Sequence, residues 1–93
     1  MIVASLEMTL YAPWVHSLKE KRMAVKSILQ KTQHQFRVSA AEVDFQDVHQ
    51  TICIAFAIVT GTMQQADSML DNIIAYVESN TEAEVTKINR NIY

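Results

Sequence analysis

The segment from Gln50 to Thr60, QTICIAFAIVT, constrains the fold more than any other part of the chain. In an extended strand successive side chains point to opposite faces, and here the two faces differ in size. The larger side chains of one face are Ile52, Ile54, Phe56 and Ile58. The smaller side chains of the other face are Cys53, Ala55, Ala57 and Val59. Because both faces are apolar, this segment is predicted to be a central strand of a sheet.

The remaining elements follow from the period of the apolar residues. Residues 2–11 alternate with period two, as in a half-buried strand, and residues 18–35 carry an apolar stripe with helical period. The chain has one glycine and one proline, so little of it is linker. The predicted elements are strands over 2–11, 37–45, 50–60 and 83–92, with helices over 18–35 and from Thr62 to about Ser79.

Local signals mark where several of these elements begin or deform. Ser17 and Glu20 have the spacing of a capping box, in which the serine hydroxyl accepts from the backbone N–H three residues later. Thr62 begins a second such sequence. In the last strand the apolar parity slips between Val85 and Ile88, which predicts a bulge or an edge position.

The element order is therefore βαββαβ over a single domain, residues 1–93. Right-handed crossovers place both helices on one face of a four-stranded sheet, with the first and third strands central. This is a ferredoxin-like α+β sandwich. Its open face is predicted to carry Glu42 and Asp44 beside small apolar residues. RNA-recognition domains of this topology need aromatic and basic residues there, so self-association through Cys53, Ala55 and Ala57, as a homodimer, is the favoured use of this face.

Composition limits the function classes. The net charge of −2 argues against a general nucleic-acid binder such as a DNA-binding protein. Residues 1–37 hold six basic and two acidic side chains, a charge of +4, whereas residues 38–93 hold two basic and eight acidic ones, a charge of −6. The single cysteine and the absence of a basic, apolar leader or a membrane span in the sequence predict a cytoplasmic protein. No cofactor motif is present.

The stretch HSLKEKR, residues 16–22, crowds cations at a helix start, where Lys19 is disfavoured by a few tenths to about 1 kcal/mol in the field of the helix. At 100° per residue, Lys19, Arg22 and Lys26 align on one flank of the apolar stripe. They are candidate ligands for a phosphate or carboxylate group, including the phosphates of RNA. The alternative is a solvated helix face that only keeps the protein soluble.

Other candidates carry weaker signals. Glu42, Asp44, Asp47 and His49 have metal-ligating atoms, but no established metal-binding motif is present and turn formation explains them as well, so no metal is predicted. Trp14 lies in a loop beside Pro13 and is either a lid over the core or an interface anchor. Cys53 has no histidine near it in sequence and is not expected to be a nucleophile.

The chain resembles the YlxP-like family, small bacterial proteins with a domain of unknown function. Two motifs carry the resemblance, SLKEKR at residues 17–22 and VSAAEVD at 38–44 followed by Gln46, Asp47 and Gln50. The family implies a ferredoxin-like fold, and its genes often lie near those of translation initiation and ribosome maturation factors. His49 stands where a tryptophan is common. The family supplies no catalytic residues to carry over.

Three functional hypotheses remain. The first is a non-catalytic binding module in translation or ribosome maturation that contacts RNA or a protein through Lys19, Arg22 and Lys26, with ribosomal RNA or the small subunit as the candidate partner. The second is a homo-oligomeric structural or regulatory protein without a nucleic-acid role. The third is a small acylphosphatase-like enzyme, which is disfavoured because the loop over residues 11–16 lacks the arginine and glycine of a phosphate cradle.

Overall fold

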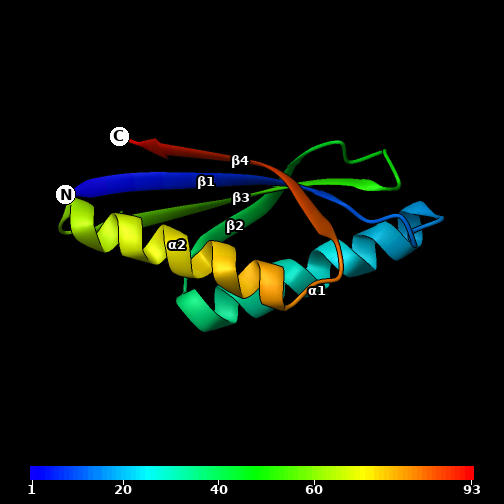
Figure 1. Ribbon diagram of the computed structural model, residues 1–93, viewed down its shortest axis with the longest axis horizontal. Coiled ribbons are helices and arrows are strands. Elements are labelled where there is room, and N and C mark those ends of the chain that lie inside the picture. The colour runs from blue at the N-terminus through cyan, green and yellow to red at the C-terminus, as the bar shows by residue number, and fades with distance from the viewer.

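The computed structural model describes all residues, 1–93, and has the predicted βαββαβ order. The elements are β1 (Ile2–Tyr11), α1 (Leu18–Phe36), β2 (Ser39–Asp44), β3 (Thr51–Thr60), α2 (Met63–Ser79) and β4 (Glu84–Ile92). The sheet is antiparallel in the order β2-β3-β1-β4, so β1 and β3 are central, as predicted. Both helices lie on one side of the sheet (Figure 1). Neither helix combines the length and apolar character that crossing a membrane requires.

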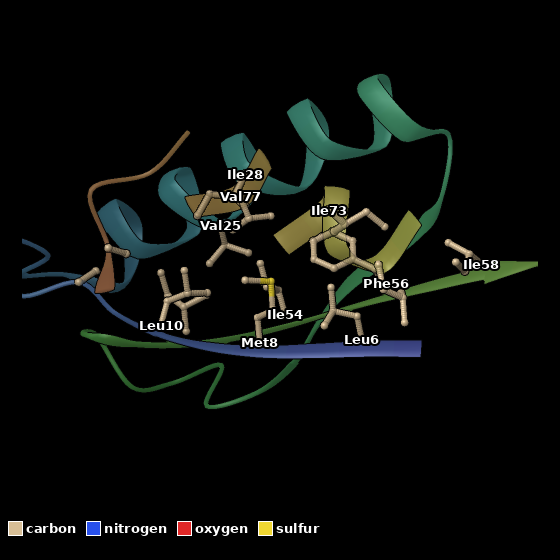
Figure 2. Packing of buried hydrophobic residues seen from close by; sticks show 14 of the residues in the cluster. Leu6, Met8, Leu10, Val25, Ile28, Ile54, Phe56, Ile58, Ile73 and Val77 are labelled. Carbon is tan, nitrogen blue, oxygen red and sulfur yellow. The ribbon is translucent and has the colours of Figure 1, made fainter. Parts of the chain in front are cut away.

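The core lies between the large-residue faces of the two central strands and the helices. In the β1–β3 register Leu6 faces Phe56, and Met8 faces Ile54; all four side chains are buried. Figure 2 shows these side chains rising from the strands toward α1 and α2. The buried helix residues that meet them include Val25, Ile28, Ala66, Leu70, Ile73 and Val77. Burial of these apolar side chains is the main favourable contribution to folding.

Side-chain caps begin both helices where the sequence predicts them. The Ser17 hydroxyl accepts from the Glu20 backbone N–H at 3.1 Å, and Thr62 accepts from Gln65 at the same distance. The Gln65 side chain also accepts from the N–H of Gly61 at 3.2 Å. These bonds satisfy backbone donors that a helix start leaves free.

Each edge strand contains one bulge. In β4, Thr9 pairs with Lys87 but Leu10 pairs with Val85, so Thr86 has no opposite residue and the predicted irregularity is confirmed. The Thr86 hydroxyl donates to the Thr9 carbonyl at 3.2 Å.

The bulge in β2 was not predicted, and it changes which face each acidic residue takes. Glu42 lies opposite Ile54 and Asp44 lies opposite Cys53, which leaves Val43 without a partner. Ile54 points into the core, so Glu42 lies on the helix side of the sheet. The expectation that Glu42 and Asp44 share the open face is therefore wrong for Glu42, because the extra residue reverses the alternation.

Replacing Ser17 with alanine should lower the free energy of unfolding by about 0.5–2 kcal/mol, because the Glu20 N–H loses its acceptor. Urea denaturation followed by circular dichroism measures this change. Ser27→Ala, at an exposed position within α1, is the control and should be neutral or slightly stabilising. Equal midpoints for Ser17→Ala and the wild type would show that this hydroxyl does not stabilise the helix.

Candidate functional site

The three cations predicted to bind an anion are all exposed on α1. Arg22 and Lys26 line a groove of about 340 Å³ between α1 and the β2 edge, whereas Lys19 lies outside its lining. Gln30 and Gln33 continue the same wall one and two turns further along the helix. The other lining residues are Val25, Leu29 and Glu42. The structure thus brings two of the predicted residues into one groove, with Lys19 one helical turn before Arg22.

The charges of this surface are not neutralised by neighbours. None of the ion pairs in the structure involves Lys19, Arg22 or Lys26. On the other helix the situation is the opposite, since Asp67 and Asp71 of α2 both contact the Arg90 guanidinium from β4. The exposed side of α1 is therefore basic with free cations, whereas α2 is acidic and partly neutralised.

Lys21 is the residue that sequence reasoning missed. Its side chain is completely buried, in a stretch where every neighbouring cation is exposed. The ammonium nitrogen lies 2.9 Å from Glu42 Oε2 and donates to the Phe45 backbone carbonyl. A signal was available, because Lys21 lies one turn before Val25 and two turns before Ile28, on the buried stripe of α1.

The residues that receive this ammonium lie at the end of β2. Phe45 has a left-handed backbone, with φ of 57°, and its N–H donates to Asp44 Oδ1 at 2.8 Å. This geometry turns the Phe45 carbonyl toward Lys21 on the helix side. Glu42 Oε2 is buried and has no hydrogen-bond partner, so its contact with Lys21 is one between opposite charges. Each buried charge therefore depends on the other.

The open face of the sheet holds the residues predicted to form an interface. Cys53 is only 1% exposed because its thiol lies against β1, where it donates to Glu7 Oε1 at 3.3 Å and accepts from Thr9 Oγ1 at 3.8 Å. Burial, followed by the hydrogen bond to Glu7, raises the pKa of the Cys53 thiol. The thiol stays protonated and is a poor nucleophile. Ala55 is half-buried and Ala57 is exposed.

The loop before α1 and the turn after β2 complete the list of candidates. Trp14 is 42% exposed, and the loop that carries it is held by Gln50, whose amide donates to the carbonyls of Pro13 and Val15 at 3.0 and 3.2 Å. Asp47 and His49 are exposed. No three of the His, Cys, Asp and Glu side chains gather into a group that could hold a metal ion.

Replacing Lys21 with methionine should lower the free energy of unfolding by about 3 kcal/mol, the lower end for a broken buried pair, because Glu42 keeps some exposure. The Phe45 carbonyl also loses its donor. Lys19→Met is the matched control at an exposed position and should change stability by less than about 0.5 kcal/mol.

A double-mutant cycle of Lys21→Met with Glu42→Gln should give a coupling free energy above about 1 kcal/mol. The measurement is chemical denaturation of all four proteins. If Lys21→Met is as mild as Lys19→Met, the ion pair does not hold α1 against β2.

Comparisons with known proteins agree with this architecture. A solution structure of a de novo designed protein with a ferredoxin fold matches with a TM-score of 0.63 and 16% identity, over 99% of this chain and 85% of that one. A Chloroflexus aurantiacus J-10-fl protein named after antibiotic biosynthesis monooxygenases matches with a TM-score of 0.56 and 13% identity, over 98% and 92% of the two chains. At these identities the likeness shows the fold alone.

Sequence comparison is more specific. The uncharacterized protein YlxP of Bacillus subtilis (strain 168) is 37% identical over 70 residues, which cover 75% of this chain and 76% of that protein. The family model DUF503, described as a protein of unknown function, matches residues 3–90. The family resemblance noted from the two sequence motifs is thereby confirmed: the chain is similar to YlxP and belongs to the DUF503 family.

Proposed function

We propose that the chain is a non-catalytic module that binds RNA through the exposed basic side of α1, formed by Lys19, Arg22 and Lys26. The observation that carries this proposal is that these three cations have no acidic partner, although the protein as a whole is acidic. A free cation retains its full attraction for phosphate, whereas one paired within the protein must first lose its partner.

The groove adds chemistry that suits RNA. Arg22 and Lys26 can each neutralise a phosphate, and the amides of Gln30 and Gln33 beside them both donate and accept hydrogen bonds. The apolar surfaces of Val25 and Leu29 in the lining can pack against a base or ribose. Ribosomal RNA of the small subunit, in the cytoplasm, is the RNA that the family resemblance implies, and it completes the proposal.

The non-catalytic part of the proposal is supported by the loop after β1. An acylphosphatase-like enzyme would need this loop to present free backbone N–H groups and an arginine to phosphate. Here the Val15 N–H donates to the Ala12 carbonyl at 3.2 Å, and the Ala12 N–H donates to the Gln50 backbone carbonyl. Residues 12–17 include no arginine. The Val15 side chain is buried. These contacts favour a structural loop over a phosphate cradle.

The test is binding of labelled small-subunit ribosomal RNA fragments, followed by fluorescence anisotropy over a salt series, with co-sedimentation with small subunits in parallel. Lys19→Glu/Arg22→Glu/Lys26→Glu should remove most of the affinity. It should also reduce the slope of log affinity against log salt by roughly 2–3 units, since each phosphate contact contributes about 0.7–0.9. The fold should persist because the three side chains are exposed.

Lys31→Glu/Arg37→Glu/Gln64→Glu/Asn72→Glu is the matched control, because it changes the net charge equally, at exposed positions outside the groove lining and outside the open face of the sheet. It should retain most of the binding. An equal loss in both charge-reversed variants would mean that only net charge matters. A wild-type protein without salt-dependent RNA binding would leave the basic side of α1 as a solvated surface and refute the proposal.

A further inference from the structure

The register of the sheet arranges the side chains of its open face in rows that cross all four strands. One row runs from Asp44 on β2 through Cys53 on β3 and Thr9 on β1 to Lys87 on β4. Directly paired residues lie on the same face, so the two exposed charges occupy opposite ends of one row. An acid marks the β2 edge and a base marks the β4 edge, at the same height along the strands.

On β2, β3 and β4 the rows beyond this one carry small or neutral side chains, whereas on β1 they include the exposed carboxylate of Glu7. These rows are Ala41–Ala55–Glu7–Asn89 and Ser39–Ala57–Ser5–Asn91, followed by the pair Val59–Val3. Alanine and serine residues of these rows line a shallow hollow of about 250 Å³. Val59 is 69% exposed. Both helices lie on the other side of the sheet (Figure 1), so neither covers this face. Short side chains let a second sheet approach to the usual packing distance of about 10 Å.

We propose that this face binds the same face of a second copy of the chain, about a two-fold axis that runs along the strands between β1 and β3. That rotation lays β4 of one copy over β2 of the other and β1 over β3. Each row therefore packs against the same row of the partner, with the strand order reversed. Lys87 then faces the partner's Asp44, and the symmetry makes this ion pair twice. Val59 meets the partner's Val3, and Glu7 of each copy lies over the partner's Ala55, where its carboxylate keeps the hydrogen bond from the Cys53 thiol of its own chain. The strands of two aligned sheets cross at about 30°, which displaces Lys87 from the partner's Asp44. The long side chain of Lys87 can span this displacement.

The available area suits a reversible dimer. Four strands about 4.8 Å apart and about nine residues long, at about 3.3 Å per residue, give a face of roughly 600 Å². The total of roughly 1,200 Å² lies at the lower limit of specific protein interfaces, below the usual total of about 1,600 Å². We therefore expect a dissociation constant in the micromolar range. It should rise with salt concentration, because two exposed ion pairs contribute to the association. This surface is on the opposite side from the groove of α1, so the inference does not depend on RNA binding.

Sedimentation velocity from about 1 to 200 µM tests the proposal, with circular dichroism to confirm folding. The wild type should be a concentration-dependent dimer. Lys87→Asp and Asp44→Lys each place like charges opposite one another and should weaken the dimer at least roughly tenfold. The double swap Asp44→Lys/Lys87→Asp restores opposite charges and should restore association. If both single variants weaken the dimer and the double variant does not restore association, the proposed axis is wrong.

Asp44 also accepts a hydrogen bond from the Phe45 N–H, which Asp44→Lys would remove. A second variant therefore tests the face while it leaves this hydrogen bond intact. Ala57→Arg introduces a large charged side chain at an exposed position in the centre of the face and should yield a folded monomer. Gln35→Arg, exposed on α1, is the control and should remain dimeric. A wild type that is monomeric at 200 µM, or a dimer that tolerates Ala57→Arg, would refute the proposal.

Discussion

The buried ammonium of Lys21 joins helix α1 to the end of strand β2, and the groove between these elements depends on that contact. Strand β2 is at an edge of the sheet and is only six residues long, so few backbone bonds hold its end. The ammonium binds Glu42 and the Phe45 carbonyl together, which fixes both the strand and the turn that follows it. A buried charge without its partners is costly, so other positions of the helix relative to the strand are disfavoured.

This contact also separates two kinds of cation in one short stretch. Lys21 is buried and paired with Glu42. Lys19, two residues before it, and Arg22, one residue after it, are exposed and have no acidic partner. The separation follows from helical geometry, because adjacent residues point about 100° apart. One of the cations crowded near the start of α1, Lys21, is thus explained by its role in the fold. The unpaired cations are what the proposed RNA contact rests on.

The two faces of the molecule have different chemistry and can act independently. The helix side carries the basic surface of α1 and the acidic surface of α2, where Arg90 holds two aspartates. The open side of the sheet carries mainly small side chains on β2 and β3 and the exposed carboxylate of Glu7 on β1, with Asp44 and Lys87 at the two ends of one row. If both proposals hold, the sheets would meet at the centre of a dimer and the basic helices would face outward on each side, so that one dimer could contact two RNA segments.

The sequence by itself determined the element order, the central strands, the core residues and the caps. Each of these depends on a short-range pattern: the alternation in β3, the helical stripe of α1, and the hydroxyl of Ser17 three residues before a free N–H. The bulge in β4 was also predictable, because the apolar parity slips there. Only the tertiary structure decided the partners of Lys21 and the face of Glu42. Both depend on the bulge at Val43, which no apolar pattern marks, and on which residues of α1 come to lie over the β2 edge. Those are properties of packing between elements far apart in the chain, whereas periodicity reports only on a single element.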